Sequence, residues 1–411
     1  MRVLLATDYY PPPLVGGRDL HVQLLAHRLA DRGHDVHVVS LAGQSGPSQE
    51  DEGPVVIHRV VGLAHYLSRY YSDKSKPFHP TLPDPGVVAH LRSLVDAIRP
   101  DVLHCHSWLV YSALFAFRRL DLPIVMTMHE YGLVCSKNTL MYGGDLCSGP
   151  MALKCIQCAA TQYGLAKAAA IVGGLRASRS LHKRVTIFLA VSKPVADAFQ
   201  LVSAGTPVTI VPPFLEDDAF TSANRPPRPS FAPDEPYIMY AGALSHHKGV
   251  DVLLNAYTSL RGPRPPLLLL GLATTDQLPP LPQDALVVKG VPHSDVLAAW
   301  AHALLGVVPS RWPDPSPFAA LEALAAGTPL IASAIGGLPY IVDDMETGLL
   351  ALPGDAEALA EKIALLLADA DLRHRLGVSG AERSRRYSWT EIVPRIEAIY
   401  QMAIDVSAHA L

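Results

Sequence analysis

The feature that most constrains the fold is an alternation of short apolar segments with amphipathic ones near the start of the chain. An apolar run at 3–6 is followed by a Pro- and Gly-containing loop at 11–17, a helical pattern at 20–32 and a second apolar run at 36–40. Gly33 suits the left-handed residue that ends many helices. This strand–helix–strand order predicts a parallel sheet covered by helices. The pattern continues with expected strands at 55–61, 102–106, 124–129, 188–191 and 208–211 and a helix at 87–98.

A second alternation follows a Pro-rich interval at 212–236, which has the composition of a linker. We expect strands at 237–241, 267–270, 286–289, 305–309 and 329–332, and helices at 250–260, 295–303, 318–326 and 391–408. A chain of 411 residues exceeds what one core usually supports. The sequence therefore predicts an α/β protein with Rossmann-like domains at 1–213 and 214–388, and a C-terminal helix at 389–411 that packs back on the first domain.

Composition excludes several classes of protein. The formal charge of −4 and a pI near 6.5 argue against a nucleic-acid binder. We find neither a secretory signal nor an apolar run long enough to span a bilayer. Five cysteines, an odd number, fit a reducing compartment, so a cytoplasmic location is expected. The basic residues Arg176, Arg179, Lys183 and Arg184 allow at most peripheral membrane contact, and such a run is more often a solvated helix face; the oligomeric state stays open.

Two glycine-containing loops are candidates for ligand contact. Gly16 and Gly17 follow the first strand and allow a ligand to approach the backbone, although a tight turn explains them equally well. The loop 240–249 contains Gly242 and ends in Lys248-Gly249 before a helix, so an ammonium and a helix N-terminus favour a diphosphate there. The alternative is a solvated lysine.

The most informative stretch is 309–329. Asp314 and Ser316 lie in a loop that leads into a helix expected to start near Phe318, and Glu322 lies one turn further. The amides at that helix start face whatever the loop encloses. A carboxylate at Glu322 accepts hydrogen bonds only, so it suits the two hydroxyls of a ribose. A solvent-exposed position on a helix also explains Glu322 taken alone, but it explains the whole stretch 309–329 poorly.

Taken together, these segments resemble the retaining glycosyltransferases of family 4, over essentially the whole chain. The matching elements are PPLVGG, MHEY at 128–131, AVS at 190–192, GALSHHKG, VPS at 308–310, DPSPFAALEALAAGTPLIAS and GGLPYIV followed by TGLL at 347–350. The resemblance implies the GT-B fold, in which two Rossmann-like domains face each other across a cleft. It makes the first domain the acceptor domain and the second the nucleotide-sugar domain.

The resemblance also implies residue roles. Catalytic positions are His129, beside the transferred sugar, Lys248, on the leaving diphosphate, Asp314, at the first-acid position, and Glu322, on the donor ribose. The full donor set is Gly16, Gly17, Gly242, Lys248, Lys289, Gly290, Val291, Arg311, Ser316, Pro317, Phe318, Ala319 and Glu322. This sequence departs from the family pattern twice: Asp314 replaces a glutamate, and Ala243 replaces an arginine expected beside the diphosphate. Arg311, His246 or His247 is a candidate substitute for that missing cation.

The implied activity is transfer, with retained anomeric configuration and without a catalytic metal, of a hexose-type sugar from a UDP- or GDP-linked donor. The acceptor is a small metabolite, a glycan or a lipid-linked precursor, and no carboxylate nucleophile is evident in the sequence. Two alternatives stay open: a catalytically impaired nucleotide-sugar-binding protein, which the two departures suggest, and a Rossmann oxidoreductase. The oxidoreductase ranks last, because no G-x-G-x-x-G opens the first helix.

Four cysteines lie close together in the first domain, at Cys135, Cys147, Cys155 and Cys158. Their number matches a tetrahedral zinc site, and two of them form a C-x-x-C pair. The stretch 141–150 between them contains Gly and Pro and is expected to lack regular structure. A structural metal, zinc before iron–sulfur, and a set of buried thiols are equally good interpretations. Because the insertion at about 135–158 starts just after His129, we expect it to border the acceptor side.

Overall fold

The computed structural model describes residues 1–12, 16–42, 46–66, 79–220, 225–272 and 279–409. The chain forms two compact units, unit 1 with Met1–Pro212 and Ile392–Leu411, and unit 2 with Pro213–Glu391. Residues 13–15 of the first glycine loop and 221–224 of the expected linker lie outside the described residues. Among the residues that are described, no helix is long and apolar enough to cross a membrane.

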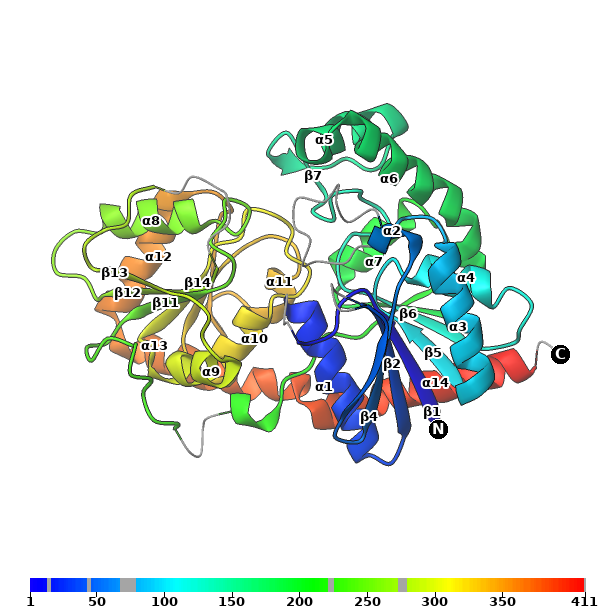
Figure 1. Ribbon diagram of the computed structural model, residues 1–411. Helices are drawn as coiled ribbons and strands as arrows, with labels where there is room; N and C mark the ends of the chain where they lie inside the picture. Colours follow the sequence, from blue (N-terminus) through cyan, green and yellow to red (C-terminus); the bar gives the residue numbers. More distant parts are fainter. Residues whose placement is uncertain (13–15, 43–45, 67–78, 221–224, 273–278, 410–411) are drawn as a thin grey trace. The chain divides into compact units, whose positions relative to one another are not determined.

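Unit 1 is built on an eight-stranded sheet with the order β10-β9-β6-β5-β1-β2-β4-β3. The pairs are parallel except for β3, which runs antiparallel to β4 at the edge. Figure 1 labels the neighbouring strands β4, β2, β1, β5 and β6 of this sheet. The strands are β1 (Arg2–Thr7), β2 (Asp35–Leu41), β3 (Ser48–Glu52), β4 (Val55–Val60), β5 (Val102–Cys105), β6 (Ile124–Met128), β9 (Ile187–Ala190) and β10 (Val208–Ile210). The central strands are buried on both faces, as near-continuous apolar runs require in a helix-covered parallel sheet.

The helices of unit 1 are α1 (Gly17–Asp31), α2 (Leu63–Tyr66), α3 (Pro85–Ile98), α4 (Val110–Ala116), α5 (Ala152–Tyr163), α6 (Leu165–Ser178), α7 (Lys193–Gln200) and α14 (Trp389–Ala408), with a 3-10 helix at Arg179–Arg184. Local sequence explains the start of α3: the Asp84 carboxylate accepts hydrogen bonds from the amides of Gly86 and Val87, and Pro85 occupies the first helical position.

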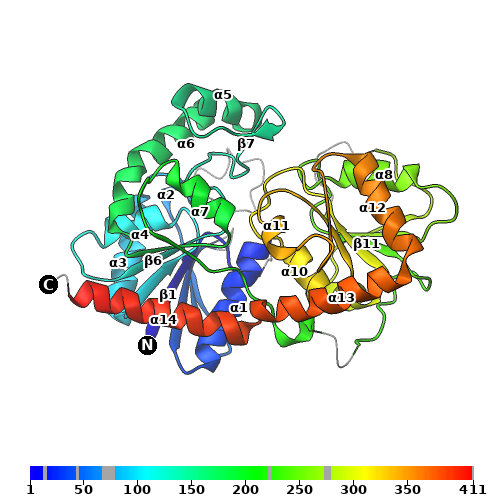
Figure 2. The ribbon, with the colours of Figure 1, turned by 180° about the vertical axis from the view of Figure 1, so that it is seen from behind.

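Helix α14 packs on unit 1, as Figure 2 shows. The hydroxyl of Tyr400 lies 2.7 Å from Nδ1 of His104 on β5, and the carboxylate of Glu397 forms two 2.7 Å hydrogen bonds with Arg32. A buried hydrogen bond and a bidentate ion pair thus fix the last helix to the sheet and to the segment after α1.

Two very short strands, β7 (Met141–Tyr142) and β8 (Asp145–Leu146), form a hairpin before α5. Gly143 and Gly144 make its turn with φ of 61° and 96°, which glycine adopts without strain. The expectation that 141–150 lacks regular structure was therefore wrong at this hairpin. The glycine pair, read in the sequence only as a sign of irregularity, is what allows it.

Unit 2 contains a six-stranded parallel sheet with the order β13-β12-β11-β14-β15-β16. Its strands are β11 (Ile238–Ala241), β12 (Leu267–Leu270), β13 (Ala285–Val288), β14 (Leu305–Val308), β15 (Leu330–Ser333) and β16 (Leu349–Ala351). Its helices are α8 (Val250–Ser259), α9 (His293–His302), α10 (Phe318–Ala325), α11 (Leu338–Ile341), α12 (Ala356–Ala368) and α13 (Ala370–Ser384), with 3-10 helices at Asp217–Ala219 and Arg385–Tyr387.

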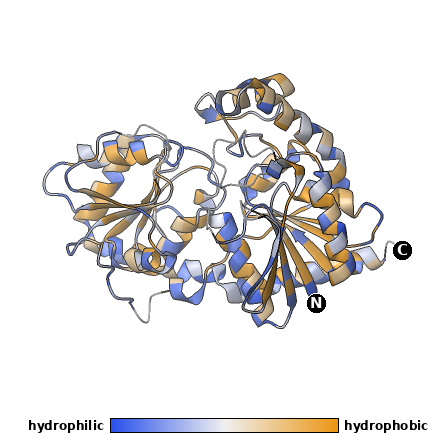
Figure 3. Cartoon of the chain, viewed as in Figure 1, coloured by the Kyte–Doolittle hydropathy of each residue, from blue (hydrophilic) through white to orange (hydrophobic). Residues whose placement is uncertain are grey.

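Apolar clusters fill both faces of this second sheet. One is centred on Trp300 and Leu268, and the other on Leu253 and Leu269. Figure 3 shows the strands of both sheets in the hydrophobic colour. The prediction of two Rossmann-like α/β units with a C-terminal helix is confirmed.

Candidate functional site

In each unit the strand order reverses next to the first strand. In unit 2, β12 and β13 lie on one side of β11, and β14, the next strand in the chain, lies on the other. In unit 1, β2 lies on one side of β1 and β5 on the other. Loops that leave such a pair of strands at their carboxyl ends diverge and form the usual ligand site of an open α/β sheet.

The loops after β11 and β14 bring Lys248 and Asp314 together. Nζ of Lys248 lies 2.6 Å from Oδ2 of Asp314, whose side chain is 5% exposed. The hydroxyl of Ser310 donates a weaker bond, at 3.3 Å, to the same oxygen. The ammonium also lies 5.1 Å from the centre of the Trp312 ring. Because an ammonium has three donors, this pair orients Lys248 and leaves it the capacity to bind a further acceptor.

Glycines allow the loops of this site to pack closely. The amide of Gly337 donates to the carbonyl of Asp314 at 2.7 Å, and a Cβ on Gly337 would lie 1.9 Å from the carbonyl oxygen of Pro315. A Cβ on Gly249, whose φ is 74°, would lie 1.8 Å from the carbonyl oxygen of Pro309. Side chains at either glycine would push apart the backbone that holds Lys248 and Asp314.

Glu322 is paired with a histidine. Its Oε1 lies 2.8 Å from Nε2 of His293, the first residue of α9, and its side chain is buried. Burial by itself would lower the pKa of His293, but the hydrogen bond and charge of Glu322, with a smaller contribution from Asp218, outweigh it, and the pKa is raised. The buried carboxylate thus has a histidine partner on one oxygen and a second oxygen on which to accept further donors.

Most of the other expected donor residues lie in three places of unit 2. Phe318 is the first residue of α10, so Ser316, Pro317 and Ala319 lie at the N-terminal end of that helix, as expected. Lys289, Gly290 and Val291 join β13 to α9, and His293 ties that connection to Glu322. Gly242 directly follows β11.

The guanidinium of Arg311 is paired with an acid in the structure, although its backbone amide donates to the carbonyl of His247 at 3.0 Å. Its Nη1 is 2.9 Å from the carboxylate of Asp251, which also lies 3.3 Å from Nδ1 of His246. Two of the three candidates for the cation missing at Ala243, Arg311 and His246, therefore bind Asp251. His247, the third candidate, packs edge-on against Trp312.

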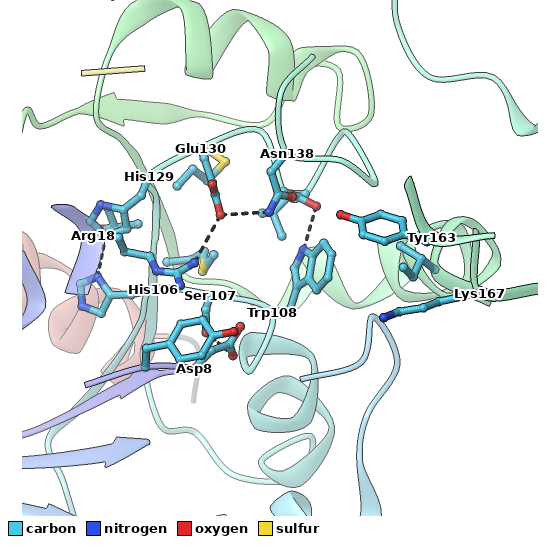
Figure 4. Close-up of a pocket in the computed structure, with 17 residues that line it drawn as sticks. Asp8, Arg18, His106, Ser107, Trp108, His129, Glu130, Asn138, Tyr163 and Lys167 are labelled. Carbon is cyan, nitrogen blue, oxygen red and sulfur yellow. Dashed lines mark hydrogen bonds and ion pairs between the residues drawn. The ribbon is translucent and has the colours of Figure 1, made fainter. Parts of the chain in front are cut away.

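A pocket of about 230 Å³ lies at the switch point of unit 1 (Figure 4). Asp8 comes from the end of β1, Ser107 from the end of β5, and Glu130 from the end of β6. The hydroxyl of Ser107 donates to Asp8 at 2.7 Å. Glu130 accepts from Arg18 at 3.3 Å and from Asn138 at 3.1 Å. The polar groups of this pocket thus hold each other in fixed orientations beside apolar side chains such as Trp108 and Leu133, a property of sites that position a ligand.

His129 lines this pocket and forms part of a histidine cluster. Its Nε2 lies 2.9 Å from Nδ1 of His106, and the ring of His21 packs at 5.1 Å from the ring of His129. Burial lowers the pKa of His129 and His106 well below the ordinary value, and lowers that of His21 to about 4. These imidazoles are therefore neutral near pH 7 and act as hydrogen-bonding groups, not as cations.

Gly16 and Gly17 stand at the start of α1, after the loop that leaves β1. Gly16 is extended, with φ −174°, and Gly17 is the first helical residue. Among the described residues, a Cβ on Gly16 would meet nothing within 4 Å. Packing against those residues thus gives no reason for glycine at 16, and the ligand interpretation stays open.

The four cysteines of the insertion carry free thiols. Burial raises the pKa of Cys155 and Cys158, and the negative charge of the other thiolates, Cys135 and Cys147 among them, adds to it. Across the described parts of the chain, no three or more His, Cys, Asp or Glu side chains are arranged to hold a metal ion. The thiols of Cys147 and Cys158 contact the carbonyls of Gly149 and Met141 at 3.6 Å. The arrangement as it stands does not fit the expected zinc.

Sequence reasoning missed several residues at these sites. In unit 1 these are Asp8, Arg18, His106 and Glu130, and in unit 2 it is His293. A usable signal existed for most of them, because Asp8, His106 and Glu130 each follow the carboxyl end of a buried parallel strand. His293 was missed because the helix was expected to begin at 295.

The pocket contacts the cysteine insertion through Asn138, while the expectation that the insertion borders the acceptor side stays a prediction. Asn138, Tyr163 and Lys167 line the pocket, the last two from the end of α5 and the first turns of α6 (Figure 4).

Comparison with known proteins agrees with this geometry. Residues 15–219 match the model of Glycosyltransferase Family 4, and residues 223–383 match that of Glycosyl transferases group 1. The glycogen synthase of Mycobacterium tuberculosis is 27% identical over 98% of this chain and 95% of its own. Sucrose-phosphate synthase from Thermosynechococcus elongatus has a similar structure, with a TM-score of 0.73 at 22% identity, over 99% of this chain and 100% of its own.

The Anabaena protein HepE, solved in complex with UDP-glucose, has a TM-score of 0.66 at 17% identity and covers 98% of this chain and 100% of its own. The two family models together span nearly the whole chain, and the similar structures share its fold from end to end. The chain belongs to the group 1 glycosyltransferases of family 4 and has the GT-B fold.

Proposed function

We propose that the chain is a retaining glycosyltransferase that moves a hexose-type sugar from a UDP- or GDP-linked donor to an acceptor bound by unit 1. The observation that carries the proposal is the pairing at the switch point of unit 2, where Lys248 is held by Asp314 and Glu322 by His293. A fixed cation and a fixed acceptor-only group, one at each end of a loop–helix segment, suit a diphosphate and its ribose.

In this proposal Lys248 stabilises the negative charge that develops on the departing diphosphate. The amides at the start of α10 assist, next to Ser316, Pro317, Phe318 and Ala319. Glu322 accepts the ribose hydroxyls on its second oxygen, and the backbone of 289–291 contacts the base. Because Ala243 supplies no charge and Arg311 binds Asp251, Lys248 is the main cation on the leaving group.

Unit 1 would hold the acceptor in the pocket of Asp8, Ser107 and Glu130, with His129 beside the transferred sugar. Neutral imidazoles suit this place, since they donate or accept hydrogen bonds with sugar hydroxyls without bringing charge. Glycogen synthase and sucrose-phosphate synthase, both similar to this chain, are named for sugar products. The oriented polar side chains of the pocket, Asp8, Ser107 and Glu130, fit an acceptor of that general kind.

We propose front-face displacement for the chemical step. The acceptor oxygen bonds to the anomeric carbon on the face from which the diphosphate leaves, the bond from that carbon to the phosphate oxygen breaks, and the acceptor proton passes to that oxygen. Asp8 is engaged by Ser107, and Glu130 by Arg18 and Asn138, which favours positioning over nucleophilic attack for both carboxylates. No metal takes part in this scheme.

A panel of UDP- and GDP-sugars, assayed for release of the nucleoside diphosphate with and without candidate sugar acceptors, tests the activity. Transfer with an α-linked donor giving an α-linked product by NMR supports the proposal, and an inverted product contradicts it. The second candidate, a nucleotide-sugar-binding protein without activity, is favoured by Ala243 and Asp314. It predicts donor binding with neither hydrolysis nor transfer.

A structural zinc at Cys135, Cys147, Cys155 and Cys158 stays a prediction. It requires the four sulfurs to converge to about 2.3 Å from one ion, which would relieve the repulsion between neighbouring thiolates. Elemental analysis of protein purified without chelator decides it, and absence of stoichiometric zinc or iron ends it.

A further inference from the structure

The helical insertion of unit 1 has an unusual charge balance. Between residues 132 and 186 lie seven of the 34 Lys and Arg residues of the chain but one of its 38 Asp and Glu residues, Asp145. The protein as a whole is slightly acidic, with a formal charge of −4. Positive charge is thus concentrated in residues 132–186, with Lys154, Lys167 and Arg176 on α5 and α6 and three more cations in the 3-10 helix Arg179–Arg184 that follows.

Large apolar side chains are exposed at the start of α5. We call this set, with its two basic neighbours, the α5 surface: Tyr142, Leu146, Met151, Leu153 and Leu201, with Lys154 and Arg176. The five apolar side chains are between 44% and 76% exposed. Helix α5 packs on α6 but fully buries one residue of its own, Ala159.

Contacts place the cations of this surface among its apolar groups. Nζ of Lys154 lies 5.8 Å from the centre of the Tyr142 ring. Met151 and Arg176 line the same small hollow. A Cβ on Gly149 would lie 3.5 Å from the side chain of Leu201, which joins Leu201 to the strand-to-helix connection before α5. These contacts place Tyr142, Met151 and Leu201 beside the basic groups Lys154 and Arg176 around the start of α5.

We propose that the α5 surface docks the protein on an anionic lipid bilayer. An apolar patch rimmed by Lys and Arg fits a bilayer surface, because the apolar groups enter the headgroup region while the cations bind anionic headgroups. A soluble polyanion would use the charges but would gain nothing from five exposed apolar side chains. The long stems of Lys154 and Arg176 allow their charges to reach the headgroups from beside buried apolar groups.

Docking here has a geometric consequence within unit 1. The same helical pair supplies Tyr163 and Lys167 to the pocket, so a bilayer on the α5 surface would lie near the pocket wall (Figure 4). The proposal does not depend on the reaction proposed above, because it concerns binding to lipid and is tested without any donor or acceptor.

The test measures co-sedimentation of the full chain with vesicles of phosphatidylcholine containing about 30% phosphatidylglycerol, and with vesicles of phosphatidylcholine alone. Met151→Ser/Leu153→Ser removes apolar groups at constant charge, and Lys154→Gln/Arg176→Gln removes charge. Leu352→Ser, at an equally exposed leucine of unit 2, and Lys362→Gln, on α12, are the matched controls. The substituted positions are at least partly exposed, so near-native thermal transitions are expected for all variants.

We expect wild-type protein and both controls to bind the anionic vesicles, with binding weakened by about 0.5 M salt. Each double variant should lower the partition coefficient by roughly tenfold or more. Three results would overturn the proposal. The first is that both double variants bind vesicles as well as wild type. The second is that the protein binds polyphosphate but not vesicles, and that Met151→Ser/Leu153→Ser leaves polyphosphate binding unchanged. The third is that the protein self-associates through this surface without binding lipid.

Discussion

Removal of the Lys248 ammonium should affect both stability and turnover, and the structure allows the two effects to be separated. Nζ of Lys248 lies 2.6 Å from Oδ2 of Asp314, and the two side chains are 24% and 5% exposed. In Lys248→Ala the carboxylate of Asp314 stays buried, with the hydroxyl of Ser310 at 3.3 Å as a weak donor.

Breaking a fully buried pair costs about 3–5 kcal/mol, because it leaves an uncompensated charge. Water reaches about a quarter of Lys248, so we expect a loss of about 2–3 kcal/mol in the free energy of unfolding. Loss of one preorganised charge from a transition state costs roughly 10²–10³ in kcat. Both losses should therefore be measurable in a protein that still folds.

Urea denaturation measures the first loss, and nucleoside diphosphate release at saturating donor measures the second. Adding Asp314→Asn to Lys248→Ala removes the buried negative charge, so the double variant should regain much of the lost stability. Turnover of the double variant should stay low. Lys362→Ala, on α12, is the control and should change neither quantity.

A folded Lys248→Ala variant with a turnover within about threefold of wild type at saturating donor would contradict the role of Lys248 on the leaving diphosphate. Recovery of both turnover and stability in the double variant would contradict that role equally, because Lys248 would then act only as a structural counter-ion.

Three further predictions concern pH and metals. Because the pKa of His293 is raised, the stabilising effect of its pair with Glu322 is complete below the ordinary histidine pKa of about 6.5 and is lost as the pH rises through the raised value. His293→Gln should therefore cost about 1 kcal/mol at pH 6 in urea denaturation, and less at pH 8; a constant difference would contradict this. Burial lowers the pKa of His21 to about 4 and of His104 to about 3, so stability is full above pH 6.5 and falls as the pH drops towards those values. His21→Gln should flatten this acid dependence, and an unchanged slope would exclude the histidine as its source. Turnover should survive dialysis against a chelator, and a loss restored by one divalent cation would show that catalysis needs a metal.

Much of the fold could be predicted because the apolar runs, the helical periodicity and the Gly- and Pro-containing loops all favoured the same alternation of strands and helices. The apolar runs at 238–241 and 267–270 became buried parallel strands, and the helix expected near Phe318 starts at that residue. The antiparallel edge strand β3 (Ser48–Glu52) was missed, since its sequence SQEDE has no apolar pattern and its pairing with β4 supplies the reason for its extended form.

The candidate site was predicted less completely than the fold. Lys248, Asp314 and Glu322 stand in local patterns that a sequence displays, a lysine before a helix and acids around a helix start. Their partners do not: His293 reaches Glu322 from another helix, and the pairing of Lys248 with Asp314 joins residues 66 positions apart. Such contacts depend on the order of the strands in the sheet, which local sequence patterns do not reveal. The sequence departs from the family pattern at Ala243, and two of the side chains weighed as substitutes there, Arg311 and His246, bind Asp251.

We propose above all that unit 2 binds a nucleoside diphosphate through Lys248 and Glu322. A crystal structure of the protein soaked with UDP or GDP tests it most directly. We predict phosphate oxygens within hydrogen-bond distance of the Lys248 ammonium and the first amides of α10, with the ribose hydroxyls on the Glu322 carboxylate. A nucleotide bound elsewhere, with Lys248 and Glu322 making no contact to it, would contradict the account.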